Sequence, residues 1–266
     1  MTVNNIHFTA LRVHFPAIGH GDHVLVQDIS FELSKGECVL LAGANGTGKT
    51  TLLKALAAGG RGSENYATLG LSEGGAHGSP WEGRRSRSDR RFSDPLPSAA
   101  RIILIPTNIP KVKGFTVEAF VRTGCYKESD WKGRISKDVK RKMEDALEIL
   151  GIQELKDRDI STLSDGEFKK ACLAVGLTRQ AEVLLLDEPT AFLDVENRIS
   201  VLQTLREVAR KTGTAVLFSS HDLHDALPVV DRVFVLTRDG RFATSGEAEE
   251  SKEEVLREAF PNLTTL

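Results

Sequence analysis

Apolar runs and helical repeats alternate along most of this chain. Residues 183–186 and residues 215–218 are uninterrupted apolar runs, which is the pattern of strands buried on both faces of a parallel sheet. The stretch between them, residues 195–211, repeats apolar side chains at helical spacing. This alternation predicts an α/β protein with a mainly parallel sheet.

The middle of the chain contains further helical patterns. Residues 116–124 form one of them, and residues 136–150 form another, which Gly151 follows at the position where glycine often ends a helix. The apolar face of the longer segment consists of Val139, Met143, Ala146, Leu147 and Leu150. Ser164 and Glu167 have the spacing of a capping box, so we expect another helix to begin directly after Ser164.

Several other segments favour β-structure. Residues 11–15 and residues 24–33 partly alternate apolar and polar side chains, as half-buried strands do. Residues 102–105 form a short apolar run that a proline ends. Near the C-terminus, Asp239-Gly240 separates two apolar runs and predicts a hairpin.

Composition places the chain among globular proteins with a sizeable core. Of its 266 residues, 40% are hydrophobic and 27% charged, and a formal net charge of -2 gives no electrostatic reason to expect nucleic acid as a partner. The cysteines Cys38, Cys125 and Cys172 have no metal-binding or disulfide spacing, and their apolar neighbours predict that they are buried thiols in a reducing compartment. No apolar run reaches the roughly 18 residues that span a bilayer, so at a membrane the chain would dock through another protein.

Residues 59–99 differ in character from the rest of the chain, because glycine, serine and arginine dominate there. Arginines lie close together at Arg84, Arg85, Arg87, Arg90 and Arg91. A basic loop in a slightly acidic protein is expected to be solvated, and contact with nucleic acid is the alternative.

Candidate chemistry begins with the phosphate loop, residues 43–50, which read Gly-Ala-Asn-Gly-Thr-Gly-Lys-Thr. The loop follows an apolar run and leads into a helical segment, which is the setting that phosphate-binding loops require. Its backbone N–H groups can surround an anion at the helix N-terminus. Lys49 can reach the β- and γ-phosphates, and the Thr50 hydroxyl can hold a magnesium ion. The expected nucleotide-binding residues are Gly43, Ala44, Asn45, Gly46, Thr47, Gly48, Lys49, Thr50 and Thr51.

Two carboxylates follow the buried run at residues 183–186. Asp187 and Glu188 therefore lie at the carboxyl end of a parallel strand, where open α/β sheets bind their ligands. One carboxylate can hold Mg²⁺, and the adjacent one can polarise a water for attack on the γ-phosphate. A charged pair that merely ends the strand is the alternative, and the phosphate loop in the same chain favours catalysis.

Five motifs stand in a recognisable order. After the phosphate loop come Leu-Ser-Asp-Gly-Glu at 163–167, Leu-Leu-Leu-Asp-Glu-Pro-Thr at 184–190, Ala-Phe-Leu-Asp at 191–194 and Ser-Ser-His-Asp at 219–222. This order resembles the ATP-binding cassette family over nearly the whole chain. The resemblance implies an α/β P-loop NTPase: a RecA-like parallel-sheet core with an N-terminal antiparallel β subdomain and an inserted helical subdomain.

The resemblance also implies how the chain is divided and how it assembles. Residues 1–266 would form a single domain, with its core at about 1–107 and 176–246, its helical subdomain at about 108–175 and a C-terminal helical tail at about 247–266. Two copies of the chain would form a head-to-tail dimer that encloses two ATP molecules with Mg²⁺. Each ATP would lie between the phosphate loop of one copy and the signature segment, residues 163–167, of the other.

Within one copy, the roles in the family transfer to single positions. Asp187 matches the carboxylate of the magnesium site, and Glu188 matches the general base or water-orienting residue. His221 matches the switch histidine, which contacts the γ-phosphate and senses its loss. Phe15 stands where the family places an aromatic side chain that stacks on adenine; a core aromatic in an edge strand is the alternative.

Other roles concern the dimer. Ser164 and Gly166 match the residues of the signature segment that meet the γ-phosphate of the other copy. Asp194 matches a residue that links the two copies conformationally.

Two departures from the family pattern concern the rim of the site. Thr107 stands where the family usually has a glutamine that contacts magnesium or the attacking water, so any such contact by Thr107 must be weaker, mediated by water or taken over by Asn108. The signature segment carries Asp165 and Glu167, and an additional carboxylate near ATP should lower affinity unless these side chains point away. The capping box would turn Glu167 back toward Ser164. We therefore expect slower or more tightly regulated hydrolysis.

Within the family, residues 114–124 and 221–227 look like segments of bacterial importer ATPases, especially those for iron–siderophore, haem or cobalamin uptake. We therefore expect ATP hydrolysis to drive import, with Lys49, Glu188 and His221 as catalytic residues. The chain would be a peripheral subunit at the cytoplasmic face of the inner or plasma membrane. Its partners would be transmembrane permease subunits and, indirectly, a substrate-binding protein, but not nucleic acid. Two alternatives stay open: a soluble cassette ATPase of an assembly process such as iron–sulfur cluster building, and a nucleotide-responsive module with little hydrolysis.

Overall fold

The computed structural model describes residues 10–20, 23–58, 68–72, 101–128, 134–245 and 256–257. Most of the arginine-rich stretch at residues 59–99 and most of the expected tail at residues 247–266 therefore lie outside the described residues. No helix within the described ranges is long and apolar enough to cross a membrane.

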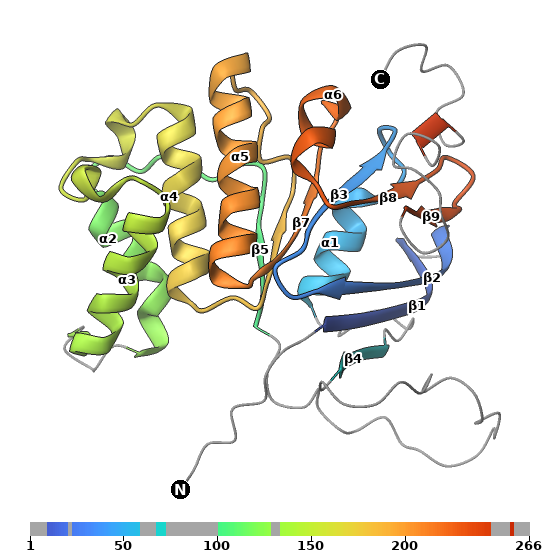
Figure 1. Ribbon diagram of the computed structural model, residues 1–266, viewed down its shortest axis with the longest axis horizontal. Coiled ribbons are helices and arrows are strands. Elements are labelled where there is room, and N and C mark those ends of the chain that lie inside the picture. The colour runs from blue at the N-terminus through green and yellow to red at the C-terminus, as the bar shows by residue number, and fades with distance from the viewer. Residues whose placement is uncertain are drawn as a thin grey trace, which may run out of the picture.

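A six-stranded sheet forms the centre of the molecule, with the strand order β5-β6-β7-β3-β8-β9 (Figure 1). Its strands are β3 (Cys38–Gly43), β5 (Ile102–Ile105), β6 (Val183–Leu186), β7 (Ala215–Ser219), β8 (Arg232–Leu236) and β9 (Phe242–Thr244). Neighbouring strands pair in parallel from β5 to β8, and β9 pairs antiparallel with β8. The buried parallel strands and the C-terminal hairpin are therefore confirmed.

A smaller antiparallel sheet with the order β2-β1-β4 lies beside the central one (Figure 1). It consists of β1 (Ala10–His20), β2 (His23–Ser34) and β4 (Thr68–Ser72). β1 is the middle strand, where Val13 pairs with Phe31 of β2 and with Leu69 of β4. The sequence patterns predicted the first two strands but not β4, which lies within the glycine- and serine-rich region.

Helices cover both faces of the central sheet. They are α1 (Lys49–Ala57), α2 (Val117–Arg122), α3 (Lys137–Ile149), α4 (Asp165–Thr178), α5 (Val195–Thr212) and α6 (Leu223–Ala226), with 3₁₀ turns η1 (Thr123–Glu128), η2 (Gln153–Leu155), η3 (Ile160–Thr162) and η4 (Leu227–Val229). Alternate residues of β6 divide the core: Val183 and Leu185 belong to the cluster that contains α1, whereas Leu184 and Leu186 belong to the cluster of α3, α4 and α5.

The helices α2, α3 and α4 gather at the end of the molecule away from the small sheet (Figure 1). They lie within or beside the expected helical subdomain, but α4 continues to Thr178, beyond the expected boundary at residue 175. Near its end, Gly176 packs so closely on β6 that an added Cβ would lie 2.6 Å from Leu184 Cδ2. The helix α4 thus joins the helical end of the molecule directly to the central sheet.

Local signals for helix ends agree with the structure. Ser136 caps α3, and Gly151 follows that helix with a φ of 62°. The capping box of Ser164 and Glu167 is present at the start of α4. The three cysteines are buried free thiols, as expected, and burial raises the pKa of Cys172 to about 12.

Candidate functional site

The phosphate loop connects β3 to α1 at the carboxyl end of the central sheet. Gly43 lies against the end of β8, where an added Cβ would be 2.6 Å from the backbone oxygen of Leu236. Gly48 precedes the first turn of α1 with a φ of 100°, which L-residues with side chains rarely adopt. Glycine at these positions lets the loop curl so that the first N–H groups of α1, which have no partner within the helix, face its concave side.

Lys49 is buried within this loop, with only 6% of its surface exposed. Its ammonium group donates hydrogen bonds to the backbone oxygens of Gly43 (2.7 Å) and Ala44 (3.1 Å). Burial lowers the pKa of Lys49, and the nearby carboxylates of Glu188 and Asp187 oppose this shift. The loop therefore holds the positively charged Lys49 ammonium group close to the two carboxylates that follow β6.

Asp187 lies at the centre of a cluster of oxygen atoms. Its carboxylate accepts hydrogen bonds from Thr50 Oγ1 (2.9 and 3.1 Å) and from Ser219 Oγ (2.9 Å). Hydroxyl and carboxylate oxygens are the donors that Mg²⁺ prefers, and it commonly takes only one or two carboxylates alongside waters and phosphates. The residues Thr50 and Asp187 therefore fit a magnesium ion.

Ser219 also belongs to this cluster, and the sequence motif at residues 219–222 gave no indication of its role. Its hydroxyl also accepts a hydrogen bond from the Glu188 backbone N–H (2.9 Å), so Ser219 fixes both residues that follow β6. The available signal was its position: Ser219 ends β7 beside Asp187 in the same way that Asp187 follows β6.

Glu188 faces His221 across the end of the sheet. Glu188 Oε1 and His221 Nε2 are 2.5 Å apart, and both side chains remain partly exposed. The backbone of Glu188 has a φ of 47°, an uncommon conformation for a residue other than glycine. Uncommon conformations of this kind cluster at active sites, and the Glu188 carboxylate lies beside the histidine.

The signature segment lies apart from this cluster, at the start of α4. Ser164 Oγ accepts a hydrogen bond from the Glu167 backbone N–H (3.2 Å), and Glu167 Oε2 accepts one from the Ser164 backbone N–H (2.8 Å). The other Glu167 oxygen lies 3.7 Å from the Arg158 guanidinium. The expectation that Glu167 turns back toward Ser164 is therefore confirmed.

Two lysines connect the segment after β5 to α4, and the sequence analysis missed both. Lys111 donates hydrogen bonds to the Asp165 carboxylate (2.7 Å) and to the backbone oxygen of Leu163 (2.8 Å). Lys169 donates one to the backbone oxygen of Thr107 (2.8 Å), and burial lowers its pKa. The charge of Asp165 is thus balanced within the chain, and the main chain at Thr107 is tied to the helix that carries the signature segment.

Asp194 and Gly166 are linked through Asn197, a further residue that sequence patterns did not indicate. Asp194 caps α5 by accepting hydrogen bonds from the Asn197 backbone N–H and side-chain amide, both at 2.8 Å. These bonds hold the pKa of Asp194 below its usual value. An added Cβ at Gly166 would lie 2.6 Å from Asn197 Oδ1, so a glycine is needed for this approach.

The structure thus brings together five of the expected residues at the carboxyl ends of the parallel strands. They are Lys49, Thr50, Asp187, Glu188 and His221. Ser164, Gly166 and Asp194 lie instead around the contact between α4 and α5. The side chain of Phe15 lies outside the described residues, although its backbone pairs with Ile29 in the small sheet.

Comparison with known proteins gives a consistent result. The family model described as "ABC transporter" matches residues 26–191. The achromobactin transport ATP-binding protein CbrD of Dickeya dadantii is 29% identical over 95% of this chain and 88% of its own length. The ferric enterobactin transport ATP-binding protein FepC of Escherichia coli is 28% identical over 90% of this chain and 82% of its own.

Solved structures agree on the fold. A nucleotide-free ATP-binding cassette from an ABC transporter superposes with a TM-score of 0.72, at 20% identity over 93% of this chain and 95% of that chain. CbiO1 of Clostridium perfringens, part of the transporter complex cbiONQ, superposes with a TM-score of 0.71, at 22% identity over 97% of this chain and 96% of that one.

Proposed function

Because the chain belongs to the ABC transporter family, we propose that it is the ATP-hydrolysing subunit of a bacterial importer for an iron chelate or a related large metal complex. The observation that carries this proposal is the cluster at the carboxyl end of the sheet. There, buried Lys49 faces Asp187 and Glu188, and Asp187 contacts Thr50. This arrangement supports a site in which one chain supplies the groups that would bind phosphate, hold a metal ion and activate water.

Each residue at this edge has a defined part in the proposed reaction. The backbone of the phosphate loop and Lys49 bind the β- and γ-phosphates. Thr50 and Asp187 would hold Mg²⁺, which when bound neutralises charge on the phosphate oxygens. Glu188 orients the attacking water and accepts its proton, and His221 contacts the γ-phosphate and keeps Glu188 in place. The products are ADP and inorganic phosphate.

The second half of each site is proposed to come from another copy of the chain. Ser164 and Gly166 of that copy would contact the γ-phosphate, so ATP binding would close a head-to-tail dimer. This role is supported by the charge balance of the signature segment, because Lys111 pairs with Asp165 and Glu167 binds the Ser164 backbone. Asp194 would transmit closure between the copies, since it is linked through Asn197 to Gly166.

The cargo class and the partners are inferred from the relatives. Proteins named for achromobactin, iron(3+)-hydroxamate and ferric enterobactin transport are similar to this chain over most of its length. The chain would accordingly dock on permease subunits at the cytoplasmic face of the membrane through its helical subdomain, at about residues 108–175. A binding protein would deliver the cargo on the other side.

The test is reconstitution with the permease subunits that this chain binds. The complex should hydrolyse Mg-ATP, and delivery of a siderophore-loaded binding protein should increase that rate. Uptake of labelled iron chelate into vesicles should require ATP on the side of this chain. A complex that assembles but shows no turnover would overturn the proposal, and turnover without any stimulation by iron chelates would overturn the cargo assignment.

A further inference from the structure

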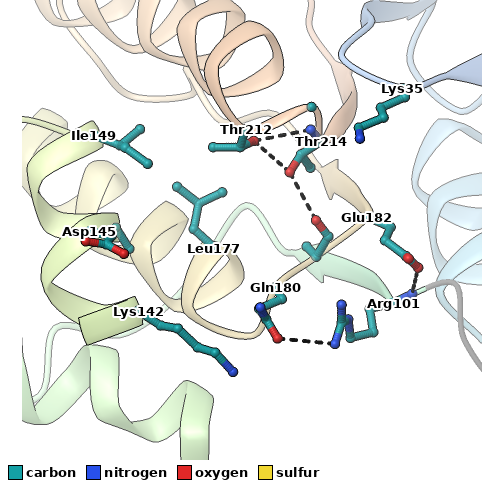
Figure 2. A pocket seen from close by; sticks show the side chains of 13 residues that line it. Lys35, Arg101, Lys142, Asp145, Ile149, Leu177, Gln180, Glu182, Thr212 and Thr214 are labelled. Atoms are coloured by element: carbon teal, nitrogen blue, oxygen red, sulfur yellow. Dashed lines mark hydrogen bonds between the residues drawn. The ribbon is translucent and has the colours of Figure 1, made fainter. Parts of the chain in front are cut away.

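A pocket of about 410 Å³ lies at the amino ends of the parallel strands (Figure 2), whereas the nucleotide cluster lies at their carboxyl ends. Its floor comes from residues that precede parallel strands: Lys35 before β3, Arg101 before β5, residues 180–182 before β6 and residues 212–214 before β7. Its other wall comes from α3 and the end of α4. We call it the α3 pocket, and its size lies in the range of small-molecule sites.

One side of the α3 pocket carries positive charge. The stem of Lys35 lies across the turn at Gly213, where an added Cβ would be 2.5 Å from Lys35 Cε. Within the described part of the chain, Lys35 has no hydrogen-bond or ion-pair partner. The Arg101 guanidinium contacts only the Gln180 side chain there, at a long 3.4 Å. Two cations thus line the same pocket with their hydrogen-bonding capacity largely unused.

The opposite side combines aliphatic side chains with the charged residues Lys142 and Asp145 of α3. Ile149 of α3 and Leu177 of α4 face the pocket with partly exposed side chains, across from Lys35 (Figure 2). Exposed aliphatic groups beside unpaired cations favour a ligand with an anionic group on an apolar body. Asp145 lies on the α3 wall and would repel an anion there. The anionic group is therefore expected at Lys35 and Arg101, with the apolar body against Ile149 and Leu177.

Among the remaining polar groups of the pocket, Lys142 forms an ion pair with Glu128 at 3.5 Å, and Asp145 is negatively charged. The Thr214 hydroxyl donates to the Ala181 backbone oxygen (3.0 Å) and contacts Thr212 Oγ1 (2.8 Å). Glu182 accepts a hydrogen bond from the Arg101 backbone N–H (2.8 Å). Gln180, which lies between them, has a φ of 54°, the left-handed conformation that ends α4: its N–H donates to the Leu177 backbone oxygen (2.7 Å), and the Ala181 N–H donates to that of Gly176 (3.3 Å). Lys35 and Arg101 are therefore the cations of the described lining that remain available to an incoming ligand.

We propose that the α3 pocket binds a small anion with an apolar body and that its occupancy regulates ATP hydrolysis. The regulatory part rests on the proposed function. Helix α4 starts at the signature segment and reaches the pocket at Leu177, so one rigid 14-residue helix, about 21 Å long, joins the two places. A ligand that clamps the end of α4 to the strand edge restricts movement of the signature segment at its other end.

Phenyl phosphate is a suitable probe, because it combines an anionic group with an apolar ring and is small enough for the α3 pocket. Calorimetric titration should show binding that is about tenfold tighter than that of inorganic phosphate, and benzyl alcohol should not bind. The double variant Lys35→Ala/Arg101→Ala should lose about tenfold or more in affinity, while Lys140→Ala, an exposed lysine of α3 outside the pocket, should bind like the unaltered chain.

Repeating the titration in Lys49→Ala separates this pocket from the phosphate loop. Binding that persists in Lys49→Ala and weakens in Lys35→Ala/Arg101→Ala supports the proposal. Binding that disappears in Lys49→Ala, equal binding of phosphate and phenyl phosphate, or no binding at all overturns it. Circular dichroism of each variant identifies loss of fold, and for a misfolded double variant the single substitution Ile149→Ser takes its place, with the same loss expected.

The regulatory claim has its own measurement. Phenyl phosphate should change the ATPase rate of the unaltered chain and leave that of Lys35→Ala/Arg101→Ala unchanged. A chain that binds the probe but does not hydrolyse ATP contradicts the proposed function and leaves the binding site standing. An active chain whose rate does not respond to the bound probe overturns the regulatory claim.

Discussion

The fold holds the phosphate-loop cluster and the signature segment in place in different ways. Lys49 is 6% exposed and bonded to two backbone oxygens of its own loop, so its position is fixed by a short stretch of chain. The Asp165 side chain is 61% exposed and is balanced by Lys111, which follows a different strand. The phosphate-loop cluster is preorganised inside one chain. The signature segment is an exposed surface on which Lys111 balances the charge of Asp165. We propose that this surface acts when another copy of the chain contacts it.

The largest effect is expected in the preorganised region. Lys49→Ala removes the buried cation, and the affinity for ATP should fall by about 100-fold or more, roughly 2.7 kcal/mol. Fluorescent-nucleotide titration measures the change. Lys54→Ala, an exposed lysine of the same helix, is the matched control. Comparable affinity in both variants would show that Lys49 does not carry nucleotide binding.

Glu188→Gln should separate binding from hydrolysis. The amide cannot accept a proton from water, so the turnover rate should fall by about 10²- to 10³-fold while the affinity for ATP stays the same. Size-exclusion chromatography with Mg-ATP should then show a trapped dimer. Glu196→Gln, an exposed glutamate of α5, controls for a simple loss of charge. A monomer in ATP would contradict the proposed role of Glu188.

Substitutions around the signature segment should have a smaller effect, and a second substitution should reverse it. Lys111→Met leaves Asp165 unpaired beside the incoming phosphates, and ATP-dependent dimerisation should weaken by about tenfold. The double variant Lys111→Met/Asp165→Asn removes both charges and should restore it. Lys113→Met, a nearby exposed lysine, should behave like the unaltered chain. Failure of the double variant to recover would mean that Lys111 acts through something other than the charge of Asp165.

The smallest effect concerns Thr107. Its backbone oxygen is held by Lys169, and the threonine side chain is shorter than the glutamine usual in the family. Thr107→Gln should extend the side chain toward the magnesium site and raise the hydrolysis rate by a few-fold, roughly 1 kcal/mol or less of barrier. Steady-state phosphate release measures this. An unchanged rate would show that threonine is not a handicap at this position.

In both regions, local sequence patterns predicted the features that depend on neighbouring residues, and they missed contacts between distant segments. The loop at residues 43–50, the buried run before Asp187 and the capping box at Ser164 each depend on neighbouring residues, so their geometry is largely written in short segments. Ser219 joins the Asp187 cluster through strand pairing, and Lys111 reaches Asp165 from 54 residues away. Neither contact has a local pattern, because both depend on how distant segments pack.

The same reasoning explains one difference in the fold. The strand β4 lies in a region of glycine and serine, where its pairing with β1 outweighs low strand propensity. The local pattern of this segment therefore gave no indication of the strand.

The central claim is that each ATP site needs both regions, one from each copy. Mixing two inactive variants, Lys49→Ala and Ser164→Arg, tests it most directly. In a mixed head-to-tail dimer, one site collects both defects and the other site has neither, so mixing should restore ATPase activity that each variant alone lacks. If both regions served the same copy, every site in the mixture would keep one defect. A mixture no more active than either variant alone would contradict the account.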